Sequence, residues 1–157
     1  MKIYKIVLVF LFIITFGCSN GKGSGNNSSK FRPLTQTADG VVVEPIKHWI
    51  SNETAFSEDG DIKYFSQTAK PNFKFFVMKV NFSVDHSQKT IDFGQEDVIG
   101  FDESGKEYFL SVPGGLQLRL ELSSTIKDGR TVELAISILP DIKIVEVEIL
   151  GAVFKVE

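Results

Sequence analysis

The chain has 157 residues, a formal net charge of −3 at pH 7 and one cysteine, and 43% of its residues are hydrophobic. Acidic residues outnumber basic ones, and no run of lysine or arginine supplies the clustered positive charge that nucleic-acid binding requires. A single cysteine cannot form a disulfide within the chain, so the fold has to depend on the packing of apolar side chains, which include 14 phenylalanines.

Residues 1–17 have the order of a secretory signal. Lys2 and Lys5 precede an unbroken apolar run, and Gly17 and Cys18 follow it. The run is shorter than the stretch of about 20 apolar residues that a membrane-spanning helix needs. We therefore expect a cleaved signal rather than a permanent transmembrane helix.

Gly17 and Cys18 resemble the end of a lipobox, the processing signal of bacterial lipoproteins. Thr15 and Phe16 differ from the strict pattern, in which leucine and a small residue are commoner at these positions. The resemblance implies cleavage between Gly17 and Cys18 and attachment to the membrane through acyl chains on Cys18. The alternative is that Cys18 is an incidental apolar residue at the end of an ordinary or uncleaved signal.

The residues after the cysteine predict a tether followed by one folded domain. Residues 19–29 read SNGKGSGNNSS and contain no apolar side chain to bury, which indicates a flexible, solvated linker. We assign residues 18–38 to the lipidated cysteine and its linker, and residues 39–157 to a single domain. The residue after the cysteine is Ser19 and not aspartate, which favours attachment to the outer membrane in a bacterium that has one.

Alternating apolar and polar residues predict β-strands along the rest of the chain. The clearest alternation covers residues 73–85, 116–122, 132–138 and 145–149, and residues 73–85 begin with apolar side chains on both faces. Shorter candidates are residues 41–46, 62–67, 90–93, 98–101, 106–110 and 152–156.

The strand patterns together predict an all-β domain of about seven to nine antiparallel strands, arranged as a sandwich rather than a barrel. No long amphipathic helix pattern occurs in the domain. Residues 45–56, PIKHWISNETAF, have helical spacing over only one turn. We interpret this segment as the end of a strand followed by a loop, with a single helical turn as the alternative.

Three segments, FFVMKVNFS, FDESGKEYF and KDGRTVELAISILP, carry a family resemblance. On these segments, residues 73–157 resemble the telokin-like immunoglobulin-fold domains of bacterial lipoproteins and secreted proteins of unknown function. The matching positions are Asp102, Gly105, Lys106 and Tyr108 in a hairpin and Gly129, Val132 and Pro140 in a later turn and strand. The resemblance implies an immunoglobulin-like β-sandwich and export, and it transfers no catalytic residue.

The sequence shows no pattern typical of a catalytic or metal site. His48 and His86 are the only histidines and have no patterned acidic or cysteine ligands near them, and no G-x-S-x-G motif is present. The acidic residues Glu96, Asp97, Asp102 and Glu103 could attract calcium, but their spacing is not that of an EF-hand, and we interpret them as turn-forming and solubilising. We therefore assign no catalytic, cofactor-binding or metal-binding residue and expect no cofactor.

The aromatic residues Trp49, Tyr64, Phe65 and Phe73 in the first half of the domain have two interpretations. Each fills the core, or exposed members of the set form a surface for a ligand or partner. Core filling is the commoner role of such a side chain.

The sequence features together predict a non-enzymatic, lipid-anchored protein of the bacterial cell envelope. We expect its domain to bind an unidentified protein or envelope ligand, with a partner strand pairing along an exposed sheet edge as one mode. The alternatives are a structural component that docks onto an envelope complex through an apolar patch, and an enzyme whose catalytic residues are dispersed along the chain.

Overall fold

A computed structural model describes residues 30–56, 65–86, 88–112, 118–125 and 129–157. The predicted signal, the Gly17–Cys18 cleavage site and the linker residues 19–29 lie outside the described residues. Within the described residues the chain forms antiparallel strands and one short 3₁₀ turn, η1 (Gln95–Asp97), and no longer helix. The predicted all-β, antiparallel class is therefore confirmed.

The strands, in chain order, are β1 (Phe31–Arg32), β2 (Gln36–Ala38), β3 (Val41–Ser51), β4 (Glu53–Phe56), β5 (Phe65–Thr68), β6 (Lys74–Ser83), β7 (Gln88–Phe93), β8 (Val98–Asp102), β9 (Glu107–Phe109), β10 (Leu118–Ser123), β11 (Arg130–Ile138), β12 (Ile144–Ile149) and β13 (Ala152–Val156).

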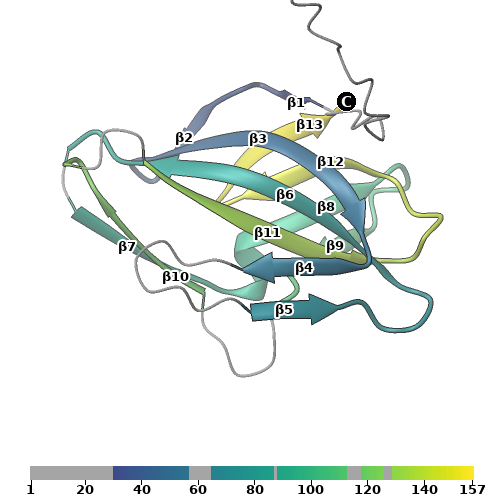
Figure 1. The fold of residues 1–157 in the computed structure, drawn as a ribbon. Coiled ribbons are helices and arrows are strands. Elements are labelled where there is room, and N and C mark those ends of the chain that lie inside the picture. The colour runs from purple at the N-terminus through teal and green to yellow at the C-terminus, as the bar shows by residue number, and fades with distance from the viewer. Residues whose placement is uncertain (1–29, 57–64, 87, 113–117, 126–128) are drawn as a thin grey trace, which may run out of the picture.

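Two larger sheets face each other across the domain (Figure 1). One has the strand order β11-β6-β3-β2, and the other has the order β1-β13-β12-β8-β9. Two smaller sheets, β10-β7 and β4-β5, lie at their margins, and none of the described sheets closes into a barrel. Along the chain, the larger sheets alternate four times: after β1, after β6, after β9 and after β11.

One apolar core fills the space between the two larger sheets. The four-stranded sheet contributes Val80, Phe82 and Leu134, and the five-stranded sheet contributes Val147 and Phe154, all fully buried. These residues occupy alternate positions along their strands, so their polar neighbours point away from the core. The alternation predicted for residues 132–138 is confirmed by β11.

The predicted loop at residues 45–56 is wrong, because β3 runs without a break to Ser51 and β4 begins at Glu53. A bulge between Pro45 and Lys47 inserts one residue into the pairing with β6. The extra residue shifts the alternation, so the apolar positions before and after it do not follow one period of two.

The ordered region also begins earlier than residue 39. β1 and β2 lie within residues 18–38, the range that the residue pattern had assigned to the anchor and linker, and Phe31 of β1 is only 1% exposed. β1 pairs with the C-terminal end of β13, and β2 forms a hairpin with β3. Asp39 and Gly40 connect that hairpin with φ values of 49° and 73°, the left-handed conformation of a tight two-residue turn.

Candidate functional site

The outer face of the four-stranded sheet, which points away from the main core, carries a row of charges. Lys47 pairs with Lys79, and Lys79 pairs with Glu133, so the three side chains lie side by side across β3, β6 and β11. Partial burial raises the pKa of the Glu133 carboxyl, and the positive charges of Lys79 and Lys47 oppose that rise. The row therefore contains two positive charges and one negative charge, a net charge of +1 when Glu133 is ionised.

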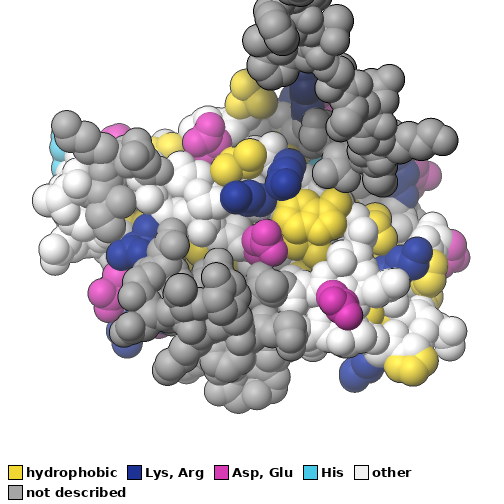
Figure 2. Space-filling view, viewed as in Figure 1, with side chains coloured by type: hydrophobic (Ala, Val, Ile, Leu, Met, Phe, Trp, Pro, Cys, Tyr) yellow, Lys and Arg dark blue, Asp and Glu magenta, His cyan; other side chains and the backbone are white. Residues whose placement is uncertain are grey.

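A second, smaller apolar cluster lies on the same outer face, beyond the row of charges. Phe75, Val77 and Ala135 are buried there, and Trp49 and Ala69 pack against them. This cluster confirms that residues 73–85 begin with apolar side chains on both faces, because Phe76 and Met78 point instead into the main core. Figure 2 shows hydrophobic side chains on this face directly beside basic and acidic ones.

Trp49 connects the apolar cluster to the charges. The Nζ atom of Lys47 lies 5.0 Å from the centre of the Trp49 ring, a distance at which the cation is attracted to the ring face. Trp49 is half-buried, so it combines the core-filling and surface roles that the sequence left open for the aromatic residues. Phe73 is 39% exposed, whereas Tyr64 and the side chain of Phe65 lie outside the described residues.

The second half of β3 is an edge of its sheet among the described strands, and we call the segment 47–51 the free edge. β2 pairs only with Val41–Val43, whereas the segment 47–51 pairs with β6 on one side and with no described strand on the other. Ile46, just before this segment, and Ile50, within it, are 49% and 51% exposed. Alternate residues of an edge strand point their N–H and C=O groups outward, so the segment 47–51 offers hydrogen bonds to a further strand.

His48 is half-buried at this edge and belongs to no group of metal-ligating side chains among the described residues. Its ring lies 5.1 Å from the ring of Phe31 and 4.9 Å from the ring of Phe76, measured between centres. Burial lowers the pKa of His48, a hydrogen bond with the backbone of Glu157 opposes that fall, and the Nε2 atom is buried without a hydrogen-bond partner among the described residues. His86 lies apart from it, exposed in the turn after β6. Across the described residues, no three His, Cys, Asp or Glu side chains are grouped to hold a metal ion.

A cavity of about 410 Å³ lies between the β4–β5 hairpin and the outer face of β6 and β11. Its walls combine two aromatic rings with amide, hydroxyl and ammonium groups; the lining residues are Gln67, Thr68, Lys70, Phe73, Phe75, Ser111, Val112 and Ser137. The Oε1 atom of Gln67 is buried and has no hydrogen-bond partner among the described residues. A pocket of this size with an apolar wall and a few polar groups is typical of a small-ligand site.

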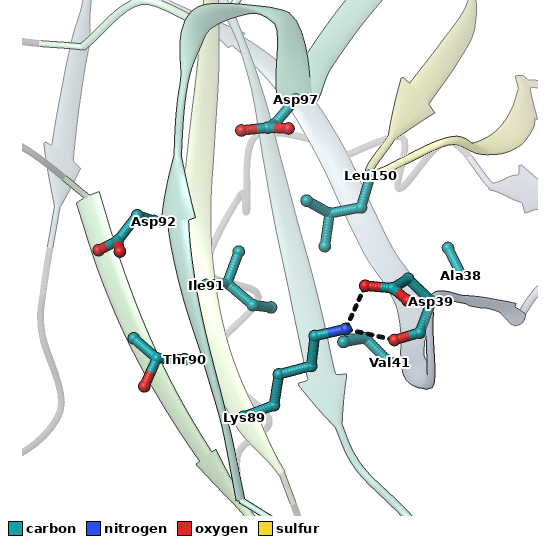
Figure 3. A pocket seen from close by; sticks show the side chains of 9 residues that line it. All are labelled: Ala38, Asp39, Val41, Lys89, Thr90, Ile91, Asp92, Asp97 and Leu150. Atoms are coloured by element: carbon teal, nitrogen blue, oxygen red, sulfur yellow. Dashed lines mark hydrogen bonds and ion pairs between the residues drawn. The ribbon is translucent and has the colours of Figure 1, made fainter.

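A second pocket, of about 320 Å³, has one lysine and three aspartates in its lining (Figure 3). Lys89 of β7 extends toward Asp39 in the β2–β3 turn and binds both its carboxylate and its carbonyl oxygen, which lowers the pKa of Asp39. Asp92 forms an ion pair with Arg119 at 3.3 Å, and Asp97 accepts a 2.6 Å hydrogen bond from the backbone N–H of Gly94. Two of the three carboxylates are therefore paired with a cation, and the third is bound by a backbone N–H.

The four acidic residues weighed as calcium ligands lie at two turns. Glu96 and Asp97 belong to η1, Asp102 is the last residue of β8, and Glu103 follows it in the β8–β9 turn. Asp102 accepts hydrogen bonds from the Ser104 hydroxyl at 2.6 Å, the Lys106 N–H at 3.1 Å and the Tyr108 hydroxyl at 2.9 Å. The turn-forming interpretation explains these contacts, which involve the residues that carry the family resemblance.

These hydrogen bonds make the β8–β9 turn sensitive to acid. The bond from Ser104 contributes most, and together they lower the pKa of Asp102 from its ordinary value of 3.8 to about 2. A carboxyl group whose pKa is lowered by folding stabilises the folded state at any pH above its ordinary pKa. This stabilisation is lost as the pH falls from about 4 to about 2. We expect Asp102→Asn to lower the thermal unfolding temperature at pH 7 by a few degrees, and the difference from the unmodified protein to narrow below pH 4.

Thermal unfolding followed by circular dichroism from pH 7 to pH 2 measures this effect. Glu103→Gln is the matched control, because Glu103 is exposed and meets Lys143, at 3.5 Å, in a surface ion pair that contributes little. A pH-independent difference for Asp102→Asn would contradict the assignment of the effect to the carboxylate charge.

The sequence predicted an exposed sheet edge as one mode of binding, but it did not indicate that the edge lies at residues 47–51 or that a cavity lies beside the β4–β5 hairpin. Gln67, Ser111 and Ser137 come from three distant segments and meet only after β5, β6 and β11 have packed. Pro45 was the one available signal for the bulge in β3, because proline inside a strand is confined to edges and bulges.

None of the described helices is long and apolar enough to cross a membrane. Comparison of the chain with protein-family models, with curated proteins and with solved structures finds no match.

Proposed function

We propose that this protein is a lipid-anchored, non-enzymatic binding module of the bacterial cell envelope, and that its free β3 edge binds an extended segment of a partner protein. Cleavage between Gly17 and Cys18 leaves Cys18 as the lipid-bearing N-terminal residue, and the polar residues 19–29 separate it from the domain. Acyl chains on Cys18 would hold the protein at the outer membrane where the envelope has one, and within reach of other envelope proteins.

An immunoglobulin-like β-sandwich is part of the proposal, and the strand order supports it. β3, β6 and β11 are adjacent in one sheet, and β8, β12 and β13 are adjacent in the other. The chain crosses between the sheets after β6 and after β11, which is the alternation of sheets found in immunoglobulin-like domains. Such domains serve many functions, so the fold alone does not assign one.

The observation that carries the function is the free edge formed by the segment 47–51. Its backbone is unpaired on one side among the described residues. Ile46 just before it and Ile50 within it are each about half exposed, and Trp49 lies on the outer face. Main-chain hydrogen bonds supply affinity in strand addition, and side-chain contacts on alternate positions supply specificity. Pro45, the bulge and Lys47 suppress indiscriminate edge pairing, so a partner has to match the apolar side chains that flank the edge.

The test replaces Ile50 with a photo-crosslinking amino acid in the full lipoprotein, expressed in the bacterium that makes it. We expect a discrete crosslinked adduct, and we expect binding of that partner to slow amide hydrogen exchange in residues 47–51. Ile50→Lys should lower partner affinity at least tenfold, because a charge at the edge opposes pairing. The substitution should change stability little, because Ile50 is half exposed.

Val153→Lys is the matched control, because Val153 is 38% exposed and lies on β13 in the other sheet. A crosslinker at position 153 should give no equivalent adduct, and Val153→Lys should leave partner affinity unchanged. Equal effects of the two lysine variants, or unchanged exchange in residues 47–51 on binding, would refute the edge as the binding site.

A further inference from the structure

Lys47 is the one permanently charged residue of the free edge, and no carboxylate is placed beside it. On its paired side it meets Lys79, and like charges directly opposite each other on neighbouring strands are unfavourable. Lys79 in turn has Glu133 on its other side. Glu44 accepts a hydrogen bond from the side-chain amide of Asn81 at 3.4 Å, and none of the ion pairs among the described residues includes Lys47. The row of charges therefore has a carboxylate at one end and a lysine at the end that faces the open edge.

A strand added to the free edge would extend this row. Residues directly opposite each other on neighbouring strands point to the same face of a sheet, with Cβ atoms about 4.5–5.5 Å apart in antiparallel pairs. The partner residue opposite Lys47 would therefore lie beside it on the outer face, on the side away from Lys79. An aspartate or glutamate there would give the row an acid at each end, whereas a lysine or arginine would place three positive charges side by side. The edge therefore favours a partner with an acidic side chain at this position.

Trp49 and Ile50 set two further requirements. Trp49 lies on the outer face two positions after Lys47, and its ring is half-buried. An aromatic or β-branched partner residue opposite Trp49 would cover the exposed part of the ring. Ile50 pairs with the core residue Phe76, so it lies on the other face of the sheet, and it is 51% exposed. An apolar partner residue opposite Ile50 would remove its side chain from water and extend the core.

We propose that the free edge selects an extended partner segment with an acidic residue opposite Lys47, an aromatic or β-branched residue opposite Trp49 and an apolar residue opposite Ile50. This selection rests on the proposed function of the edge and adds the chemistry of the partner. All strand pairs among the described residues are antiparallel, so we place the partner antiparallel to β3. From its N-terminus to its C-terminus the segment then reads apolar, aromatic or β-branched, any residue, acidic.

Fluorescence anisotropy of dye-labelled peptides, titrated with the full-length lipoprotein in micelles of a nonionic detergent, tests this selection. The probe is the peptide Ser-Thr-Val-Phe-Thr-Glu-Thr-Ser, and two matched peptides carry glutamine or lysine in place of the glutamate. We expect the glutamate peptide to bind at least about fivefold more tightly than the lysine peptide, because an attraction to Lys47 becomes a repulsion. The glutamine peptide should lie between them, and the difference should narrow in about 1 M salt, which screens the charges.

Lys47→Glu should reverse the order of the glutamate and lysine peptides. It should not lower the unfolding temperature, because it removes the like-charge pair with Lys79, and this separates altered selection from lost folding. Lys106→Glu is the matched control, because it makes the same change of charge at an exposed position in the β8–β9 turn of the other sheet. This control should keep the original order of the peptides.

Three outcomes would overturn the proposed selection: equal affinities for the three peptides, an order that Lys47→Glu leaves unchanged, or no binding of the glutamate peptide at millimolar concentration. The crosslinking test at Ile50 uses the natural partner and is independent of these peptides. A discrete adduct at Ile50 together with equal peptide affinities would keep the free edge as the binding site and reject only the acidic requirement.

Discussion

Cys18→Ala is expected to abolish fatty-acid labelling of the protein and to release it from the membrane fraction. Cys18 is the only cysteine in the chain, so no second thiol can accept the lipid. Each buried methylene of an acyl chain contributes about 0.8 kcal/mol, and a single chain gives only marginal binding, whereas two or three anchor a protein stably. Loss of all the chains should therefore move nearly all of the protein out of the membrane fraction.

Metabolic labelling with radioactive palmitate, followed by membrane fractionation, measures this result. Ser19→Ala is the matched control, because it changes the neighbouring residue and leaves the thiol in place. Labelling and membrane retention that persist in Cys18→Ala would show that Cys18 is an incidental residue of the signal, and the lipoprotein proposal would have to be abandoned.

Gly129→Ala is expected to destabilise the domain by about 2–4 kcal/mol, the sum of backbone strain and a steric overlap. Gly129 has a φ of +69°, a conformation that favours glycine. A Cβ atom at this position would lie 2.5 Å from the carbonyl oxygen of Phe82 and 2.9 Å from the Oδ1 atom of Asn81. Arg130 pairs with Phe82 immediately afterwards, so neither backbone can move away without breaking the β6–β11 ladder.

Urea denaturation followed by the fluorescence of Trp49, the only tryptophan, measures the free energy of unfolding. Gly40→Ala separates the two causes, because Gly40 has a φ of +73° but a Cβ atom added there would meet no described atom within 4 Å. We expect the Gly40 variant to lose only about 1 kcal/mol, the cost of strain alone. Equal losses for the two variants would show that the contact with Phe82 is unimportant.

The long strands were predictable because their pattern depends on burial of one face. β6 and β11 have apolar side chains at alternate positions over most of their length, and the observed pairing places those positions in the main core. The apolar start of β6 also predicted burial on both sides, and Phe75 and Val77 are buried in the second cluster.

The short strands predicted at 90–93, 98–101, 106–110 and 152–156 are confirmed by β7, β8, β9 and β13. Others, such as β1 and β4, could not be predicted, because partners elsewhere in the sequence create them. β1 has two residues and is a strand only because Phe31 and Arg32 pair with Val156 and Lys155 at the other end of the chain. β4 is defined in the same way by its pairing with β5. A segment of two to four residues carries too little alternation to be distinguished from a linker or loop.

Residues within a few positions of one another were enough to predict the all-β class and the turn around Asp102. The signal of residues 1–17 and the polar tether also depend on local composition, and they stay predictions. The free edge of β3 and the cavity beside Gln67 depend on which strands become neighbours and where a bulge changes the register. Pairing between distant segments determines both features, so only the tertiary structure places Ile46 and Ile50 at an open edge and assembles Gln67, Phe73, Ser111 and Ser137 around one cavity.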